Sequence, residues 1–432
     1  MIPARTVIIG LGQTGLSCVH HCVRKGVRPV VMDTRTAPPG AEQLPAGLEC
    51  YFGGLNPEVL CGADLIIVSP GVPLATPELQ QAAAVGVEII GDVELFLREC
   101  TAPVIAITGS NGKSTVTTLV GEMAAEAGLA VGVGGNIGTP ALALLEQPLA
   151  LAVLELSSFQ LETTPGLKAL AATVLNISED HLDRYDSLAH YRDTKLGIYQ
   201  GAGLCVYNRE DSETYPPKGS KALSFGLNGQ DYGRLEQNGE LWLSVHGEPV
   251  LAVRELRIVG AHNQLNALAA MALADKAGIS RIAQLAVLRR FTGLAHRCQF
   301  VAEKNGVRWI NDSKATNVGA TLAAIDGIAG DINGRLWLIA GGQGKGQDFS
   351  PLVPLLQTRI AGMACLGQDK EQLLALGANT HAVASMNEAV AWCAGQAAAG
   401  DWVLLAPACA SLDMYPNYPA RGDHFVSLVE AL

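Results

Sequence analysis

Short apolar runs alternate with amphipathic stretches along this 432-residue chain. Apolar runs bounded by Gly, Pro or Asp predict buried strands, and stretches with apolar positions three to four residues apart predict helices between them. Strands are expected at 7–9, 29–32, 65–68, 87–90, 104–107, 151–155, 173–175, 204–207, 308–310, 336–340, 362–366 and 402–405, with a β-rich insertion around 241–253. The alternation predicts an α/β protein with parallel sheets, divided into three blocks at 1–92, 93–293 and 294–432.

The segment TGSNGKST at 108–115 lies between an expected strand and an expected helix at 116–127. A Gly-rich turn at a helix N-terminus presents backbone N–H groups to phosphate oxygens. Lys113 then reaches a terminal phosphate, and the hydroxyl of Ser114 or Thr115 binds Mg²⁺. The usual pattern has a Gly where this chain has Ile107, so a Gly-rich turn that merely contains a lysine stays as the alternative. ATP chemistry is the leading hypothesis.

A second Gly-rich turn, Gly10-Leu11-Gly12-Gln13-Thr14-Gly15, follows the first expected strand, and Asp33 ends the next one. This spacing is typical of a dinucleotide-binding turn with the acid on a ribose, which makes a nicotinamide-dependent dehydrogenase a competing interpretation. The same backbone also suits the diphosphate of a UDP-sugar. A purely structural packing of helix on strand is the third interpretation.

Polar side chains follow several expected strands or lie on expected helices. Glu155 ends a buried strand and is a candidate Mg²⁺ ligand, or a solvated strand end. Asn136 lies in an expected loop at 134–138, and His181 lies in an acidic loop where it binds metal or phosphate or is simply exposed. Lys195 falls on the apolar face of an expected helix, where a lysine is costly unless it is paired, modified or able to reach solvent.

The composition of the chain limits the classes of partner that it can bind. Hydrophobic residues make up 49% of the chain and the net charge is −11, which argues against nucleic acid and anionic membranes. No run of about 18 apolar residues occurs, so no membrane insertion is expected. The ten cysteines form no Cys-x-x-Cys pair and indicate a reducing compartment. We expect a cytoplasmic protein and a monomer; a non-catalytic nucleotide sensor remains the second alternative to an enzyme.

Taken together, the motifs resemble those of the Mur ligase family. They are TGSNGKST, GGNIG, LELSSFQL, NISEDHLDRY, YRDTKLGIY, HNQLNALAA, GLAHRCQ, NDSKATN, GGQGKG and ACASLDMYPNY, in the family's order over essentially the whole chain. The turn at 10–15 with Asp33, and the ACASLDMYPNY segment, are most similar to the D-glutamate-adding branch. The Asp-Asn-Pro-Arg motif of the diaminopimelate-adding branch is absent.

The resemblance implies three domains: a Rossmann-like N-terminal domain that binds a UDP-linked substrate, a P-loop-type central ATPase domain, and a Rossmann-like C-terminal domain that binds the amino acid. It implies an ATP-dependent ligase that phosphorylates the carboxylate of UDP-N-acetylmuramoyl-L-alanine. The amine of D-glutamate then attacks the acyl phosphate, and a tetrahedral intermediate collapses to amide, ADP and phosphate.

The resemblance also assigns residues. For ATP it implies Gly109, Asn111, Gly112, Lys113, Ser114, Thr115, Asn263, Asn266, Arg297 and Asp312, with Lys314 near phosphate; for the UDP-linked substrate Gly12, Thr14, Asp33, Thr34, Arg35, Gly71 and Asn136; for D-glutamate Thr316, Lys345, Ser411, Leu412 and Tyr418. The last stands where the family pattern has Phe. Lys113, Glu155, His181 and Lys195 are the implied catalytic set. Two Mg²⁺ ions are implied, held by Ser114, Glu155, His181 and a Lys195 that CO₂ has converted to a carbamate.

Overall fold

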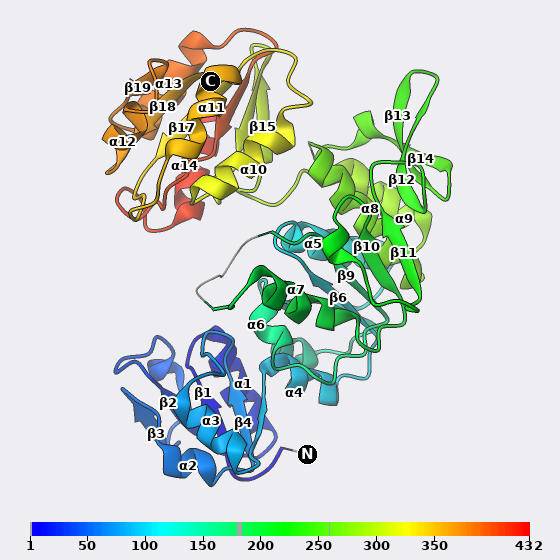
Figure 1. Cartoon of the computed structure of the whole chain (residues 1–432), viewed down its shortest axis with the longest axis vertical. Coiled ribbons are helices and arrows are strands. Elements are labelled where there is room, and N and C mark those ends of the chain that lie inside the picture. The colour runs from blue at the N-terminus through cyan, green and yellow to red at the C-terminus, as the bar shows by residue number, and fades with distance from the viewer. Residues whose placement is uncertain (1, 179–183, 259) are drawn as a thin grey trace. The chain divides into compact units, whose positions relative to one another are not determined.

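A computed structural model describes residues 2–178, 184–258 and 260–432. The chain forms two compact units: the first contains residues 1–251 and 266–287, and the second contains 252–265 and 288–432. The division falls inside helix α8 (Ala261–Lys276), which begins in the second unit and ends in the first, and inside helix α9 (Arg281–Arg290), which begins in the first and ends in the second. Figure 1 shows three separate sheets along the chain, each covered by helices.

The first unit begins with a five-stranded parallel sheet in the order β3-β2-β1-β4-β5. Its strands are β1 (Thr6–Ile9), β2 (Val30–Asp33), β3 (Cys50–Phe52), β4 (Leu65–Val68) and β5 (Glu88–Ile90); its helices are α1 (Gln13–Arg24), α2 (Pro57–Cys61), α3 (Pro77–Ala84) and α4 (Asp92–Glu99). The sequence prediction missed β3, whose side chains are largely exposed and carry little apolar signal.

A nine-stranded sheet follows in the order β14-β13-β12-β11-β10-β9-β6-β8-β7. Its strands are β6 (Val104–Thr108), β7 (Val131–Gly135), β8 (Leu151–Glu155), β9 (Ala171–Val174), β10 (Cys205–Asn208), β11 (Ala222–Phe225), β12 (Tyr232–Gln237), β13 (Glu240–Val245) and β14 (Glu248–Ala252). Its helices are α5 (Lys113–Glu126), α6 (Ser158–Leu161), α7 (Leu188–Leu196), part of α8, and α9 (Arg281–Arg290). Strand β7 takes in Gly134 and Gly135, which the sequence suggested were loop; a strand of Gly and Val lacks a clear alternating pattern.

The two sheets of this unit share a core. Alternate residues of β1 face opposite ways: Ile8 packs with α1 and α4 in a cluster that continues into the central sheet, while Val7 and Ile9 pack on the other face. The shared cluster includes Phe96 of α4 and Leu154 of β8. The first and central sheets are therefore held together by buried apolar side chains.

The second unit has a six-stranded sheet in the order β15-β16-β20-β17-β18-β19. Its elements are β15 (Gln299–Lys304), β16 (Val307–Asn311), α10 (Val318–Ile328), β17 (Leu336–Gly341), α11 (Val353–Thr358), β18 (Ile360–Leu366), α12 (Lys370–Leu374), β19 (Thr380–Ala382), α13 (Met386–Gln396), β20 (Trp402–Leu405) and α14 (Tyr418–Glu430). Helices α10, α11 and α12 cover one face, and α13 and α14 cover the other, each over its own core. All pairs except β15–β16 are parallel, so the loops after β16, β17 and β20 meet at one edge.

Candidate active site

The turn between β6 and α5 has the backbone of a phosphate-binding loop. Gly109 and Gly112 have φ values of +149° and +82°, which residues with a Cβ rarely adopt. A Cβ on Gly112 would lie 2.5 Å from Oδ1 of Asn266, so the turn and the first unit's part of α8 are in close contact. Lys113 donates to the backbone oxygens of Gly109 (2.9 Å) and Ser110 (3.0 Å), and Ser114 is buried. The lysine folds over the turn it is expected to serve.

The segment after β9 supports this turn through a side chain that the sequence analysis did not single out. Asn176 accepts from the Asn111 N–H at 2.7 Å and donates to the Asn111 carbonyl at 3.0 Å. Ser110 donates to the Ser178 carbonyl at 3.1 Å and accepts from the Ser178 N–H at 2.9 Å. Strand β9 lies beside β6, so its carboxyl end braces the turn. The position of Asn176, an amide side chain directly after a strand, is the signal in the sequence that could have identified it.

Lys195 of α7 is 2% exposed and lies beneath the same turn. Its ammonium group donates to the Gly109 carbonyl at 3.1 Å and to Oγ1 of Thr108 at 3.4 Å, and lies 4.6 Å from the centre of the Tyr191 ring. The expected apolar face is therefore real, and the side chain does not reach solvent. Two lysines, Lys113 and Lys195, approach the carbonyl of Gly109.

Glu155 ends β8 beside β6 and β7 and is 3% exposed. Its Oε1 accepts from the side chain of Asn136 at 2.9 Å, while its Oε2 is buried without a hydrogen-bond partner in the described part of the chain. A buried carboxylate oxygen without a donor suits a cation ligand, because leaving it bare is costly. The residues present therefore fit Mg²⁺.

Not every implied metal ligand can be located. His181 lies outside the described residues, so its position is not available for comparison with Glu155. Among residues 2–178, 184–258 and 260–432, no three His, Cys, Asp or Glu side chains gather as a metal site.

A cavity of about 600 Å³ in the first unit collects the residues expected for the UDP-linked substrate. Gly10, Gly12, Gln13 and Thr14 come from the first Gly-rich turn, Ser69–Val72 from the loop after β4, and Gly135, Asn136, Gly138, Pro140 and Gln160 from the end of β7, the segment after it and α6. Asp33, Thr34 and Arg35 complete its lining, so all seven expected residues border one cavity. Because Asn136 also contacts Glu155, this cavity adjoins the proposed metal ligand.

The carboxylate of Asp33 is already fully hydrogen-bonded within the protein, which the dinucleotide interpretation did not predict. Its carboxylate accepts from the Leu11 N–H at 2.7 Å and the Arg35 N–H at 2.9 Å, and from two guanidinium nitrogens of Arg35 at 2.9 and 2.7 Å. Burial alone would raise the pKa of Asp33, but these donors lower it to about 2. Four accepted bonds fill a carboxylate's capacity, so Asp33 holds Leu11 and Arg35 in place instead of offering itself to a ribose.

In the second unit, the residues expected for D-glutamate lie on three loops at the carboxyl edge of the sheet. Thr316 follows β16, Lys345 follows β17, and Ser411 and Leu412 follow β20. The loops are joined directly: Gln343 and Ala410 exchange backbone hydrogen bonds of 2.9 and 3.0 Å. Tyr418, the first residue of α14, accepts at its carbonyl from the Ser313 hydroxyl at 2.8 Å.

The same edge carries Arg297, Asp312 and Lys314. Burial raises the pKa of Asp312 to about 6, although hydrogen bonds from Cys298 and the nearby Arg297 oppose it. Burial and Arg297 lower the pKa of Lys314, whose ammonium lies 4.6 Å from the centre of the Tyr418 ring. Of the expected ATP residues, Asn263, Arg297 and Asp312 belong to the second unit, and Asn266 with the phosphate turn belongs to the first.

Four of the eight non-glycine residues with positive φ in the described part of the chain lie at this edge. His296, Cys298, Lys345 and Ala408 have φ values of +63°, +41°, +56° and +57° without being glycine. Such conformations cost of order 1–3 kcal/mol each and persist where the surroundings impose them. Their position beside the expected ligand residues marks this edge as a site.

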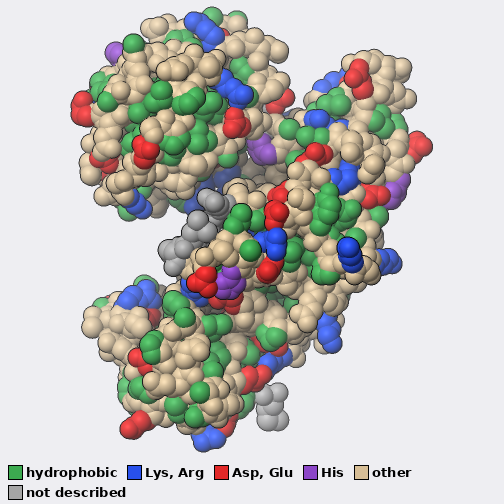
Figure 2. Space-filling model, in the orientation of Figure 1, with side chains coloured by type: hydrophobic (Ala, Val, Ile, Leu, Met, Phe, Trp, Pro, Cys, Tyr) green, Lys and Arg blue, Asp and Glu red, His purple; other side chains and the backbone are tan. Residues whose placement is uncertain are grey.

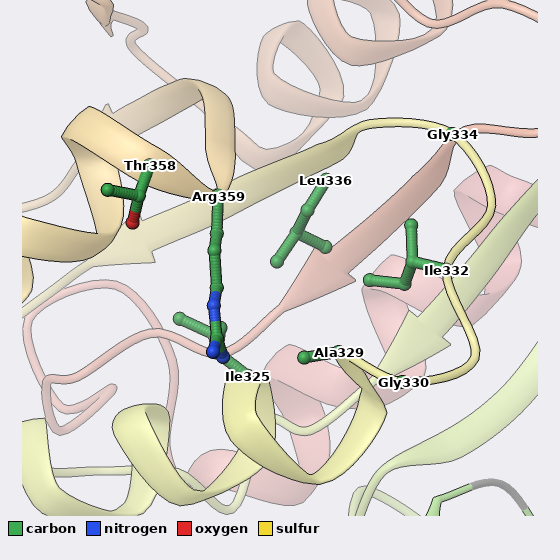
Figure 3. A pocket seen from close by; sticks show the side chains of 8 residues that line it. All are labelled: Ile325, Ala329, Gly330, Ile332, Gly334, Leu336, Thr358 and Arg359. Carbon is green, nitrogen blue, oxygen red and sulfur yellow. The ribbon is translucent and has the colours of Figure 1, made fainter.

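Another cavity, of about 430 Å³, lies at the opposite edge of the same sheet. Figure 3 shows Ile325, Ile332 and Leu336 around it, with the Arg359 side chain extending across it toward Ile325. Arg359 is ion-paired with Asp326 at 2.7 Å. No expected site residue lines this cavity.

The distribution of charge on the surface and the lengths of the helices bear on the expected partners. On the face shown in Figure 2, acidic, basic and hydrophobic side chains are interspersed, with no broad basic area. Of the helices within the described ranges, none is long and apolar enough to cross a bilayer.

The fold and the candidate sites together define a class: a multidomain α/β protein with a Gly-rich turn at a helix N-terminus in its central sheet, a cavity of about 600 Å³ in the same unit that reaches Asn136 beside Glu155, and a second unit whose loops meet at one edge of its sheet. Residues 4–91 match the family model "Mur ligase MurD-like, N-terminal domain", residues 107–274 match "Mur ligase middle domain", and residues 296–409 match "Mur ligase, glutamate ligase domain". This chain belongs to the Mur ligase family.

Curated relatives extend over nearly the full length. The chain is 56% identical over 432 residues to the UDP-N-acetylmuramoylalanine–D-glutamate ligase of Pectobacterium atrosepticum, covering 99% of this chain and 98% of the relative. It is 55% identical to the ligase of the same name from Salmonella paratyphi A, with the same coverage. Membership of this family also removes the dehydrogenase interpretation of the first Gly-rich turn.

Solved structures share the fold. The UDP-N-acetylmuramate-alanine ligase MurC of Thermotoga maritima superimposes with a TM-score of 0.60 at 19% identity, covering 99% of both chains. The MurF ligase of the same organism, in complex with ADP, has a TM-score of 0.61 at 15% identity, covering 98% of this chain and 94% of that one. These likenesses confirm the predicted α/β fold of three domains.

Proposed function

We propose that this protein is the ATP-dependent ligase that joins D-glutamate to UDP-N-acetylmuramoyl-L-alanine, with ADP and phosphate as products, in the cytoplasmic synthesis of peptidoglycan precursors. The observation that carries the proposal is the identity of 54–56% over 99% of the chain to relatives named for this reaction. The cavity bordered by all seven expected residues supports the nucleotide-sugar assignment.

The chemistry requires a leaving group. A carboxylate and an amine do not form an amide at useful rates, so the terminal phosphoryl group of ATP passes to the carboxylate of the muramoyl-alanine. The amine of D-glutamate attacks this acyl phosphate, and the tetrahedral intermediate expels phosphate. The protein's task is to align the reactants, neutralise their negative charge and exclude water.

The phosphate turn supplies the first cations. Lys113 is withdrawn onto the carbonyls of Gly109 and Ser110, and we propose that it exchanges these partners for phosphate oxygens when ATP binds. The N–H groups of Gly109 to Thr115 and the α5 terminus bind the phosphate chain. Asn263, Asn266, Arg297 and Asp312 would complete the nucleotide site.

Glu155 and Ser114 would hold one Mg²⁺, and His181 with Lys195 a second. The unpartnered Oε2 of Glu155 supports the first assignment. Bound there, Mg²⁺ would neutralise phosphate charge and act as a Lewis acid. Asn136, which donates to the other oxygen of Glu155, holds that carboxylate in one orientation.

We further propose that Lys195 is carbamylated. Its neutral amine would add to the carbon of CO₂ and release a proton, which gives an anionic group. The burial of Lys195 beneath the phosphate turn supports this, since an anion beside a metal ion is favourable.

In the second unit, Thr316, Lys345, Ser411, Leu412 and Tyr418 would bind D-glutamate. Lys345 is exposed on its loop and offers a charge to a carboxylate, and Ser411 is 2% exposed and offers a hydroxyl. The three sheets support a division into a UDP-substrate domain at 1–92, an ATP domain at 93–293 and an amino-acid domain at 294–432. We expect a monomer.

An omission assay tests the proposal. Purified protein is given ATP, Mg²⁺, UDP-N-acetylmuramoyl-L-alanine and D-glutamate, and phosphate release and product mass are measured while each component is left out in turn. We expect phosphate and the glutamyl product only in the complete mixture. L-Glutamate, L-alanine, L-lysine and diaminopimelate are the matched controls. Product from one of these and none from D-glutamate would refute the assignment.

A further inference from the structure

Arg421 of α14 is the feature of the second unit that neither the motifs nor the proposed ligand residues use. It is 1% exposed, one of the largest fully buried side chains of the protein. Its guanidinium donates from Nε to the Ser313 hydroxyl at 3.0 Å, from Nη2 to the carbonyls of Ser313 (2.9 Å) and Cys409 (3.1 Å), and from Nη1 to the Gly341 carbonyl at 3.4 Å. One side chain therefore contacts three loops.

These loops carry the residues proposed for D-glutamate. Ser313 lies in the loop that leads to Thr316, Gly341 begins the turn that contains Lys345, and Cys409 is two residues before Ser411. They follow β16, β17 and β20, which are neighbours in the sheet. A Cβ on Gly342 would lie 3.3 Å from Nη1 of Arg421 and 2.2 Å from the Ala410 carbonyl, so these loops pack closely around the guanidinium.

All the acceptors of Arg421 within the described residues are neutral oxygens. Burial lowers the pKa of Arg421 to about 10, with Cys409, Asp413 and Tyr415 acting in the opposite direction. Asp413 is exposed, and its carboxylate accepts from the Gln368 N–H at 2.8 Å. The guanidinium is still protonated at neutral pH, so a positive charge lies under the ligand edge without a hydrogen-bonded carboxylate.

We call a buried charged side chain that joins separate segments by hydrogen bonds a clamp. A second clamp, with a structural role, lies at the opposite, amino edge of the same sheet. Asp401 is 4% exposed and also joins separate segments, by accepting from the N–H groups of Arg335 and Ala398 and from the indole of Trp337. Its charge, however, is matched by the Arg335 guanidinium at 3.0 Å. The clamp at the amino edge is charge-balanced, and the clamp at the carboxyl edge is not.

We propose that Arg421 is a positioning residue for the amino-acid substrate: it fixes the three loops and leaves at their edge a net positive potential that attracts a dicarboxylate. The inference rests on the proposed function. D-Glutamate carries two carboxylates, and a buried cation attracts them strongly because little solvent screens it. The charge of Arg421 acts without direct contact, and its hydrogen bonds hold the loops that make the contacts.

Two variants separate charge from shape. Arg421→Lys keeps the charge with fewer donors, and Arg421→Gln keeps donors without the charge. Both lose part of the clamp, so both should melt at a lower temperature than the parent. We expect Arg421→Gln to raise the KM for D-glutamate roughly tenfold or more, with the KM for ATP changed less than about twofold. Arg421→Lys should raise the KM for D-glutamate several-fold less than Arg421→Gln does.

Asp401→Asn is the matched control, since it weakens the clamp at the other edge. It should lower the melting temperature and leave the KM for D-glutamate within about twofold. Equal KM values for D-glutamate in Arg421→Lys and Arg421→Gln, or an unchanged KM in Arg421→Gln, would overturn the proposal, because a structural role alone gives those results. If Arg421→Gln is not recovered folded, Arg421→Met replaces it. If neither folds, Arg421→Lys decides: a rise of about tenfold or more in its KM for D-glutamate, although the charge is kept, rejects a role of the charge in substrate attraction.

Failure of this inference and failure of the proposed function give different results. Parent protein that forms no product from D-glutamate defeats the proposed function. Parent protein that forms product, with variants that differ only in melting temperature, defeats the role of Arg421 alone.

Discussion

The first unit contains two Gly-rich turns of the same kind, each between a buried strand and a helix, and they differ in the charge around them. The turn after β1 has no lysine, and the nearest carboxylate, Asp33, is fully occupied by Leu11 and Arg35. The turn after β6 has Lys113 within it and Lys195 beneath it. Both present N–H groups at a helix terminus, so the backbone alone does not distinguish them.

We infer that this difference reflects the two roles proposed for these turns. Holding a diphosphate needs N–H donors and an open cavity, which the first turn provides. Moving a phosphoryl group also needs cations fixed before the reaction starts, because charge builds up during transfer. A motif of glycines therefore indicates phosphate, and the basic side chains around it indicate transfer.

The largest expected effect is in the second turn. Lys113→Ala should lower turnover by at least a hundredfold to a thousandfold, on the order of 3 kcal/mol or more, because a preorganised cation is lost where phosphate charge is greatest. Phosphate release under saturating substrates measures it. Lys25→Ala, at a half-exposed lysine paired with Glu99 after α1, should retain parental turnover. If Lys113→Ala keeps more than a tenth of the parental rate, the two turns do not differ as described.

Lys195→Ala should also lose most activity, and short carboxylic acids should restore part of it by taking the place of the carbamate. The same acids should not restore Lys113→Ala, whose lost group is a cation. Rates with and without added acid, in both variants, give the answer. Equal rescue of both, or of neither, would remove support for an anionic Lys195.

Arg35→Met tests the first turn. It removes two donors from Asp33 and leaves that carboxylate less compensated beside an anionic ligand, so the KM for the UDP-linked substrate should rise about tenfold. The KM for ATP should stay within about twofold. Arg24→Met, at an arginine of α1 paired with Glu146, is the control and should change neither constant. A larger effect on ATP than on the UDP-linked substrate would reverse the assignment of the two turns.

The smallest effect contrasts two carboxyl groups of this unit. The pKa of Asp33 is about 2, so its contribution to stability is present above about pH 4 and is lost as the pH falls through 2. Burial raises the pKa of Asp92, the first residue of α4, to about 6, and both oxygens of its carboxylate are buried without a hydrogen-bond partner in the described part of the chain. Folded Asp92 holds its proton between about pH 4 and 6 while the unfolded chain releases it, so stability falls as the pH rises through that range.

Asp92→Asn should therefore stabilise the protein at about pH 7, by on the order of 2 kcal/mol, and have little effect at about pH 4. Calorimetric melting of parent and variant at the two pH values measures the difference. A variant that is less stable at pH 7 would mean that ionised Asp92 has a compensating partner.

Much of the fold could be read from local patterns. The buried strands β1, β4, β6, β8, β17, β18 and β20 are mostly apolar and lie close to where the alternation predicts them. The sequence prediction missed strands β3 and β19 because their side chains are mostly exposed, and it missed β15, which is only half-buried. The Gly-rich turns, Glu155 after its strand and Lys195 on its apolar face are also local features, since each depends on residues next to it in the chain.

The partners of those residues depend on distant segments. Asn176 braces Asn111 from 65 residues away, and Arg421 reaches Ser313 across 108. No spacing rule relates such positions, because the order of strands in a sheet brings their loops together. The sequence by itself determined the elements, the phosphate turn and the types of side chain available for chemistry. Only the tertiary structure decided which of them meet, since burial of apolar faces, not chain distance, sets which strand ends are neighbours.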